Sequence, residues 1–294
     1  MTRVVLPARG GAYRWYSADV VAGDVTALVT FMLGSVFSGR YSTSHKKGGA
    51  AREHAAVHFA LYEKGVRVAW VVNEFQEVCV EDDGRTLRVG ASSLSYRDEG
   101  FTMRVVGMPT PWAAAVEATV DFVCDTPPGA EQAVVNGLVH RWQPLCVRGR
   151  AHLVVPTWEL DVTGVGSHDS HAGDVPLGMG GLVGWDQVRT HRAATSDLRL
   201  APWGAPALIA ESMNGTVCVA RRDLEVERTR SNWGLRLPTS LGVAGPPTVL
   251  ESSPFYARLE ASADGAHALA EVADFERFHG SSSGVRADGK ARVA

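Results

Sequence analysis

The sequence predicts an all-β protein whose antiparallel strands form a sandwich or a barrel. Apolar residues recur at every second position in most segments, which is the pattern of strands with one buried face. Turns such as Glu63-Lys-Gly and Asp98-Glu-Gly separate these segments. Only residues 182–192 and 267–277 suggest helices, and the second is equally compatible with a strand. Short strands at this spacing are typical of antiparallel sandwiches and barrels.

The first part of the chain, up to residue 124, alternates along most of its length. A Glu-Lys-Gly turn joins the second and third predicted strands, and Asp-Asp-Gly and Asp-Glu-Gly precede the fourth and fifth. The predicted strands are residues 26–33, 54–62, 66–72, 86–89, 101–106 and 115–123.

Residues 125–136 contain Thr-Pro-Pro-Gly and form the expected boundary between two domains. We therefore expect one β domain over residues 1–135 and a second over 136–279, with a pocket between or within them. Residues 280–294 are small and polar, and we expect a disordered tail there. The strands predicted after the boundary are residues 138–147, 150–155, 158–165, 189–199, 207–213, 216–221 and 254–261.

Composition and charge argue against a nucleic-acid-binding, a secreted or a membrane-spanning protein. The net charge of -3 over 294 residues leaves no electrostatic footprint for nucleic acid. The opening Met-Thr-Arg-Val-Val-Leu-Pro lacks a secretory pattern, and the apolar residues 25–36 are too few to span a bilayer. We expect a cytoplasmic protein that an apolar substrate can bring to a membrane surface. The cysteines Cys79, Cys124, Cys146 and Cys218 are far apart, so buried free thiols are expected.

Two pairs of residues between positions 137 and 177 carry the candidate chemistry. His140 and Trp142 are two positions apart, and so are Ser167 and Asp169. On an extended strand this spacing places both side chains of a pair on one face. An acid beside an aromatic wall suits the protonation of a carbon–carbon double bond and the shelter of the cation that results.

A set of short segments occurs in a characteristic order along the chain. They are Gly11-Ala-Tyr-Arg-Trp-Tyr, Gly34-Ser-Val-Phe-Ser, Glu53-His-Ala-Ala-Val-His-Phe-Ala-Leu-Tyr, Ser92-Ser-Leu, Pro111-Trp, His140-Arg-Trp-Gln-Pro, Gly166-Ser-His-Asp-Ser-His-Ala-Gly-Asp-Val-Pro-Leu and Ser253-Pro-Phe-Tyr-Ala-Arg. Together they resemble the carotenoid 1,2-hydratase (hydroxyneurosporene synthase) family, nearly end to end. The resemblance implies a lipocalin-like fold with two β domains, which is similar to that of the decalin-forming Diels–Alderases.

The resemblance also implies an activity without a cofactor. Hydratases of this family add water to the terminal isoprenoid double bond of acyclic carotenoids. Their proposed acid and base residues are a His and a Trp two apart, then a Tyr and an Asp two apart. These positions match His140, Trp142, Ser167 and Asp169, so Ser167 stands in place of the tyrosine. A serine is shorter and a poorer acid, and it leaves space for a bulkier or folded substrate.

Each candidate has a chemical role and a structural alternative. Asp169 is the candidate proton donor, because an alkene is a weak base and needs a neutral acid; burial would raise the carboxyl pKa from ~3.9. Trp142 is the candidate cation stabiliser, and His140 the candidate for a proton relay or for positioning water. The alternatives are a turn aspartate, a core tryptophan and a hydrogen-bonded histidine.

Aromatic residues are candidates for lining an apolar substrate tunnel, although aromatic residues in β proteins usually belong to the core. No metal site is expected at His168, His171 and Asp174, since His168 alternates away from Asp169 on a strand and the family resemblance implies no metal. The aromatic candidates are Trp15, Tyr16, Phe37, Trp112, Trp185 and Tyr256.

Three hypotheses for function remain, all with an apolar polyene or isoprenoid as the partner. The first is a hydratase in which Asp169 protonates a double bond and water captures the cation. The second is a cyclase on the same scaffold, in which an internal alkene captures the cation or the pocket folds the polyene for a pericyclic step. The third is a carrier of apolar ligands without catalysis, because a fold does not fix a function.

Overall fold

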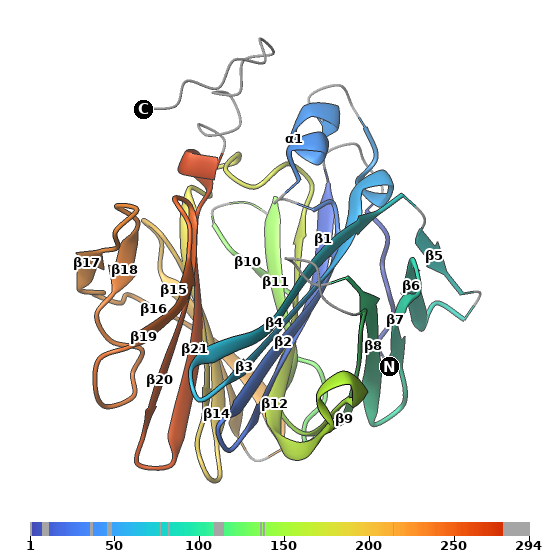
Figure 1. The fold of residues 1–294 in the computed structure, drawn as a ribbon. Helices are drawn as coiled ribbons and strands as arrows, with labels where there is room; N and C mark the ends of the chain where they lie inside the picture. The colour runs from blue at the N-terminus through green and yellow to red at the C-terminus, as the bar shows by residue number, and fades with distance from the viewer. Residues whose placement is uncertain are drawn as a thin grey trace, which may run out of the picture.

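Almost all regular structure in this protein is antiparallel β-strand, so the all-β prediction is confirmed (Figure 1). The computed structural model describes residues 2–278 apart from 8–11, 36–37, 46–48, 77, 82, 109–114, 136, 138 and 214. Within these residues, no helix has the length and apolar character needed to cross a membrane. The short helices are α1 (Gly39–His45), η1 (Ala51–His54) and η2 (Pro156–Trp158).

The larger of two main sheets has twelve strands and curls into a nearly closed barrel (Figure 1). Its strands are β1 (Tyr13–Ala22), β2 (Val25–Leu33), β3 (Ala55–Glu63), β4 (Val66–Phe75), β5 (Val78–Val80), β6 (Thr86–Val89), β7 (Ser92–Tyr96), β8 (Gly100–Gly107), β9 (Val116–Cys124), β10 (Gln132–Ala133), β11 (His140–Val155) and β12 (Leu160–Gly173). The order is β4-β3-β2-β1-β12-β11-β9-β8-β7-β6-β5, with β10 paired to β11. The side chain of Asn73 on β4 exchanges two hydrogen bonds with the backbone of Met108, just after β8.

The smaller sheet has seven strands and packs against the outside of the barrel (Figure 1). Its strands are β13 (Gly184–His191), β14 (Ser196–Pro202), β15 (Ala207–Met213), β16 (Thr216–Arg222), β19 (Thr248–Ser252), β20 (Tyr256–Ala263) and β21 (Ala266–Asp274). The order is β16-β15-β14-β13-β21-β20-β19. A separate two-stranded ribbon pairs β17 (Arg228–Arg230) with β18 (Arg236–Pro238).

Both segments that suggested helices are strands. The regions 182–192 and 267–277 contain β13 and β21, which pair with each other along their length. Every residue of β13 is buried, and β21 has only two residues that are partly exposed. A strand such as β21, which is covered on both faces, loses the polar alternation that marks a strand in sequence, so periodicity cannot distinguish it from a helix.

The change from one sheet to the other comes later than the expected domain boundary. β11 and β12 lie between β9 and β1 in the barrel, so the smaller sheet begins at Gly184 and not after residue 135. The predicted strands 138–147 and 150–155 form the single long strand β11. The division into two domains stays a prediction, and the expected tail at 280–294 lies outside the described residues.

Strand β1 separates two interiors. Tyr16 and Ala18 pack inside the barrel, whereas Trp15 belongs to the core between the two sheets. Successive side chains of a strand point to opposite faces, and here both faces are covered. As a result β1, β2 and β3 are buried along almost their whole length. Polar side chains on these strands therefore need partners from across the interface.

The cysteines are free thiols, but not all of them are buried. Cys146 is buried and Cys124 is partly buried, whereas Cys79 and Cys218 are exposed. The expected burial was therefore wrong for these last two. Cys79 lies on β5 and Cys218 on β16, which are end strands of the two sheets. End strands are covered less completely than central ones, so an apolar sequence there does not guarantee burial.

Candidate functional site

Polar side chains form a row across the outer face of the barrel. In the strand register Asp169 pairs with Ser17, Ser17 with Thr30, and Thr30 with His58. Cross-strand neighbours lie on the same face of a sheet, so these four side chains face the smaller sheet together. The hydroxyls of Ser17 and Thr30 lie 3.1 Å apart and share a hydrogen bond.

Polar side chains of β13, in the smaller sheet, contact the side of the barrel that carries this row. The amide of Gln187 donates a hydrogen bond to Asp169, and Arg189 donates another to the same carboxylate at 3.3 Å. His191 contacts the carboxylate of Asp19 at 2.6 Å. The interface between the sheets is therefore joined by hydrogen bonds and ion pairs, and not by apolar packing alone.

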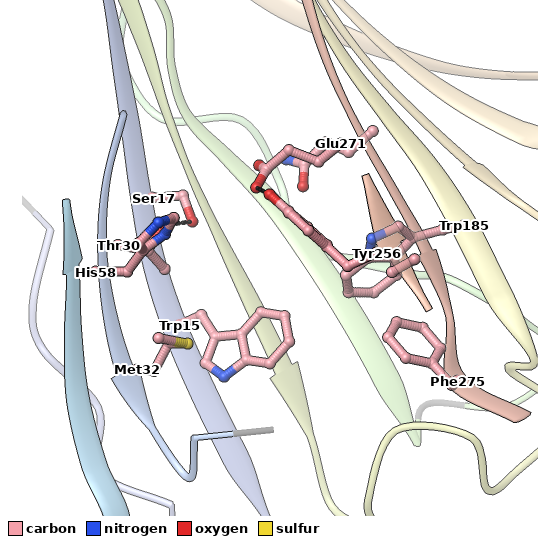
Figure 2. A pocket seen from close by; sticks show the side chains of 11 residues that line it. Trp15, Ser17, Thr30, Met32, His58, Trp185, Tyr256, Glu271 and Phe275 are labelled. Atoms are coloured by element: carbon pink, nitrogen blue, oxygen red, sulfur yellow. Dashed lines mark hydrogen bonds between the residues drawn. The ribbon is translucent and has the colours of Figure 1, made fainter. Parts of the chain in front are cut away.

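A small cavity lies between the two sheets (Figure 2). Its volume of about 40 Å³ is enough for two or three water molecules. Trp15, Met32 and Phe275 lie at one end of it, while Ser17, His58 and Glu271 lie at the other (Figure 2). The complete lining is Trp15, Ser17, Thr30, Met32, His58, Trp185, Gln187, Tyr256, Glu271, Ala273 and Phe275.

The apolar end of the cavity is an aromatic wall. The rings of Trp15 and Trp185 meet edge to face, with centroids 6.0 Å apart, and Trp185 meets Phe275 in the same way at 5.0 Å. The ring of His171 is tilted against Trp185 at 4.6 Å. Aromatic faces of this kind stabilise a nearby cation, the more so when water is excluded.

Asp169 is fully buried and surrounded by donors. The indole N–H of Trp142 donates to it at 2.7 Å, and Nε2 of His171 lies 3.3 Å from its Oδ2 atom. Burial raises the pKa of this carboxyl, but the charge of Arg189 and the hydrogen bonds from His171 and Trp142 outweigh burial and hold the pKa below its ordinary value. The expectation of a raised pKa was therefore wrong, because the compensating cation comes from the other sheet.

Arg189 lies at the centre of the charged groups, with none of its side chain exposed. It contacts Asp169 at 3.3 Å, Glu271 at 2.8 Å and Asp19 at 3.7 Å. Although burial lowers the pKa of this guanidinium, the carboxylates raise it above its usual range. Arg189 therefore stays charged, and it holds these acids together as an ionised cluster.

A second guanidinium extends the cluster beside the cavity. Arg258 donates to the hydroxyl of Tyr256 at 2.7 Å, and this hydroxyl donates in turn to Glu271 at 2.6 Å. Burial raises the pKa of Glu271, but Arg189 and Arg258 lower it to about 2. Glu271 is thus a carboxylate on the cavity wall.

His140 lies apart from this cluster. Its Nε2 faces the carbonyl oxygen of Met179 at 2.7 Å, so Nε2 carries the proton, and Nδ1 accepts a hydrogen bond from the hydroxyl of Tyr13 at 2.9 Å. Burial lowers the pKa of His140. Both ring nitrogens are therefore occupied, which leaves neither for a water molecule in this arrangement.

Only some of the other site residues predicted from the sequence lie at the cavity. Trp15, Trp185 and Tyr256 line the cavity. Tyr16 points into the barrel, where its hydroxyl accepts a hydrogen bond from the backbone N–H of Val5, because neighbouring residues on a strand face opposite ways. Phe37 and Trp112 lie outside the described residues.

Ser167 is turned toward another carboxylate. Its hydroxyl and its backbone N–H both donate to Asp19, the latter at 3.1 Å. Ser167 and Asp19 face each other across β12 and β1. A tyrosine at position 167 would need the space that Asp19 and its partner His191 now fill.

No metal-binding group of three or more His, Cys, Asp or Glu side chains is found among the described residues. His168 points into the barrel, where Nδ1 donates to the carbonyl of Ser17 at 2.8 Å and Nε2 accepts from Tyr96 at 2.9 Å. Burial lowers its pKa to about 4. His168 therefore belongs to the barrel interior and His171 to the interface.

Several residues of the site were not anticipated from the sequence, namely His58, His171, Gln187, Arg189 and Glu271. A signal for part of the set was present. Gln187, Arg189 and His191 follow one another at every second position, so a strand there would carry three polar side chains on one face. Residues 182–192 suggested a helix and the predicted strand began only at residue 189, so this pattern was missed.

Comparison with known families identifies the chain. The family model for the carotenoid hydratase CrtC matches residues 28–282. The chain belongs to the CrtC carotenoid hydratase family. This CrtC-family chain is 26% identical over 281 residues to the acyclic carotenoid 1,2-hydratase of Thiocapsa roseopersicina, with 86% of this chain and 67% of that protein covered. The resemblance that the ordered segments indicated is confirmed.

Two solved structures share the fold of the CrtC-family chain. A Nitrosomonas europaea protein assigned as AttH gives a TM-score of 0.55 at 12% identity and covers 92% of this chain and 98% of its own. The structure of CghA with Sch210972 gives 0.53 at 12% identity, with 92% and 94% covered. At this identity the likeness concerns the fold, and it confirms the all-β, lipocalin-like class.

The buried neutral histidines make the stability of the CrtC-family chain sensitive to acid. Burial, helped by the charge of Arg258, lowers the pKa of His58 to about 3, and burial lowers that of His168 to about 4. Both titrate near ~6.5 when unfolded. Between these values the unfolded chain binds more protons, so stability is complete above pH ~6.5 and is lost as the pH falls toward ~4.

We expect the free energy of unfolding to fall by about 2.5 kcal/mol per pH unit near pH 5, because the unfolded chain then holds nearly two more protons than the folded one. Urea unfolding at several pH values between neutrality and this point measures the slope. A free energy that is independent of pH in this range would contradict the neutral state of His58 and His168.

Proposed function

We propose that this chain is a cofactor-independent hydro-lyase that adds water to a carbon–carbon double bond of an apolar isoprenoid or polyene. Membership of the CrtC family supports an enzyme of this class. The observation that carries the proposal is the cavity, in which an aromatic wall adjoins a buried cluster of ionised and proton-carrying groups. Such a site stabilises a carbocation at one end and handles protons at the other.

The low pKa of Asp169 changes its proposed role. A carboxylate holds no proton to give, so we assign the proton to the pair formed by Asp169 and His171. Nε2 of His171 lies beside Asp169 and contacts Gln187 at 3.1 Å, while its buried Nδ1 has no hydrogen-bond partner among the described residues. Paired with the carboxylate, this imidazole can carry the proton that the alkene takes up.

The proposed reaction leaves the pair as it began. The ring of His171 packs against Trp15 and Trp185, which line the cavity, so it reaches the substrate once these rings have moved aside. Its imidazolium then gives a proton to the terminal carbon of the double bond, which leaves a tertiary cation on the adjacent carbon. The indole faces of Trp15 and Trp185 and the carboxylate of Asp169 stabilise that cation. Water then forms the new carbon–oxygen bond, and the proton that it loses returns to the pair.

The other proposed catalytic residues act around Asp169. Trp142 fixes the carboxylate through its N–H group, which differs from the face-on contact expected from the sequence. Ser167 orients Asp19, which contacts Arg189. His140 stabilises the start of β11 through its hydrogen bond to the carbonyl of Met179. In this proposal the three are positioning residues, since each acts through the carboxylate or the backbone that it hydrogen-bonds.

The cavity must widen to admit a substrate. At about 40 Å³ it holds a few water molecules, so the end of an isoprenoid chain requires Trp15, Trp185 or Phe275 to move apart. The same aromatic wall keeps water from the apolar end, and this observation favours cyclisation as the second candidate function. In that case an internal alkene of the substrate captures the cation.

Mass spectrometry separates these functions. The purified protein is incubated with an acyclic carotenoid, or with a shorter prenyl polyene, in water labelled with oxygen-18. A product heavier by one labelled water is expected for the hydratase. A product of unchanged mass with a new retention time supports the cyclase, and recovery of bound, unchanged polyene supports a carrier and contradicts the proposed reaction.

A further inference from the structure

His58 is the one imidazole among the described residues of the cavity wall, and the proposed reaction gives it no role. It lies on β3 with 6% of its surface exposed, at the end of the row that runs through Ser17 and Thr30. Its Nε2 atom is buried and has no hydrogen-bond partner among the described residues. Native proteins rarely leave a buried ring nitrogen unpaired, so an imidazole of this kind on a cavity wall indicates a ligand.

The protonation state of His58 decides what that ligand can be. Burial and the charge of Arg258 lower its pKa to about 3, so the ring is neutral at ordinary pH. A neutral imidazole has one nitrogen that donates and one that accepts. It therefore suits a small neutral molecule that can both donate and accept a hydrogen bond, and it does not suit an anion.

The surroundings of His58 are polar and have the size of a water site. The hydroxyls of Ser17 and Thr30 lie next to it in the row, and the Tyr256–Glu271 pair faces it from the other sheet (Figure 2). The cavity volume of about 40 Å³ is enough for two or three water molecules. A water needs two to four polar partners, and this end of the cavity supplies them.

We propose that His58 positions the water molecule that captures the substrate cation. The water is hydrogen-bonded to the ring of His58 at the polar end of the cavity, so its oxygen faces the aromatic end, where the cation forms. The oxygen forms its bond to the cationic carbon, and the proton it loses leaves to the Asp169–His171 pair. This inference rests on the proposed function. It adds His58 as a residue that controls the capture of the cation by water and not the protonation of the alkene.

The test separates protonation from capture. The solvent is heavy water that is also labelled with oxygen-18. Reversible protonation places deuterium in the recovered alkene, whereas capture of the cation by water places oxygen-18 in the alcohol. His58→Phe keeps a ring but removes both nitrogens. We expect it to lower alcohol formation by about 10²-fold, the loss that follows when a reacting group is misplaced, while deuterium uptake continues. His58→Gln keeps an amide that can bind water and should restore part of the alcohol.

A matched control uses a histidine on the barrel surface. His152→Phe changes the same residue type at an exposed position on β11, so both labels should be unaffected. Circular dichroism and thermal melting establish that the His58 variants fold. If a folded His58→Phe variant lost both labels in parallel, His58 would be a structural residue; if alcohol formation were unchanged, the water would be held elsewhere. Either result overturns the proposal.

A second measurement keeps this inference apart from the proposed function. A high-resolution crystal structure of the wild-type protein should show a water within hydrogen-bond distance of a His58 ring nitrogen, and this water should be absent in His58→Phe. Wild-type protein that takes up neither label from any polyene would overturn the proposed function. In that case the crystal structure still tests the water site by itself. A wild-type structure without a water at His58 would overturn the proposed water site.

Discussion

Asp169→Asn is expected to abolish turnover in a protein that still folds. The amide oxygen can accept the hydrogen bond from Trp142, and Arg189 keeps Glu271 and Asp19 as partners. What is lost is the negative charge that stabilises the proton on His171. We expect turnover to fall by about 10³-fold, within the range of acid–base groups. Product formation followed by mass spectrometry measures the loss.

The control for this variant is a carboxylate on the surface. Asp197 pairs with the exposed Arg192, outside the interface, so Asp197→Asn should keep wild-type turnover. Circular dichroism establishes that both variants fold. If Asp169→Asn retained most of its activity, a pericyclic reaction governed by the shape of the cavity would explain the data better than proton transfer.

Arg189→Met is expected to cost about 3–5 kcal/mol of stability, as is usual when one partner of a buried ion pair is removed. The variant keeps the length of the side chain but removes the cation that Asp19, Asp169 and Glu271 share. Buried carboxylates without a cation must either stay charged at high cost or take up protons. Urea unfolding at neutral pH measures the change, and the loss should shrink as the pH is lowered.

Two comparisons make this result specific. The exposed Arg192 pairs with Asp197, and Arg192→Met should cost no more than about 1 kcal/mol, as is usual for a surface pair. Adding Asp169→Asn to Arg189→Met should recover part of the stability, because one buried charge is removed with its partner. If the two substitutions were simply additive, the contact between Asp169 and Arg189 would contribute nothing.

The fold was largely predictable because alternation and turns are local signals. β2, β3 and β8 were located from their own sequences to within a few residues. β21 was not, since it is buried along almost its whole length and its apolar pattern has no clear period. In β13 the alternating Gln187, Arg189 and His191 were a strand signal that was not used. The prediction split β11 into two strands, residues 138–147 and 150–155. The split lies next to the register shifts that the structure has between residues 144 and 149.

The candidate site was predictable only where its members are close in sequence. The spacing of Ser167 and Asp169 placed both side chains on one face, and both do face the smaller sheet. The ionisation of Asp169 could not be predicted, because Arg189 reaches it from a strand that pairs in a different sheet. Burial alone predicts a raised pKa, and the sign changes only when the cation across the interface is known.

One face of strands β1, β2 and β3 packs in the barrel core, and the other packs against the smaller sheet. This limits which amino-acid substitutions the three strands can accept. A change of side-chain volume on one face of a close-packed strand moves the backbone and so disturbs the other face. These strands therefore tolerate little variation, since they hold the barrel core as well as Ser17, Thr30 and His58. Trp185, Tyr256 and Phe275 approach from outside the barrel. New substrate preferences can accumulate there, by successive substitutions on the smaller sheet, while the barrel is inherited unchanged.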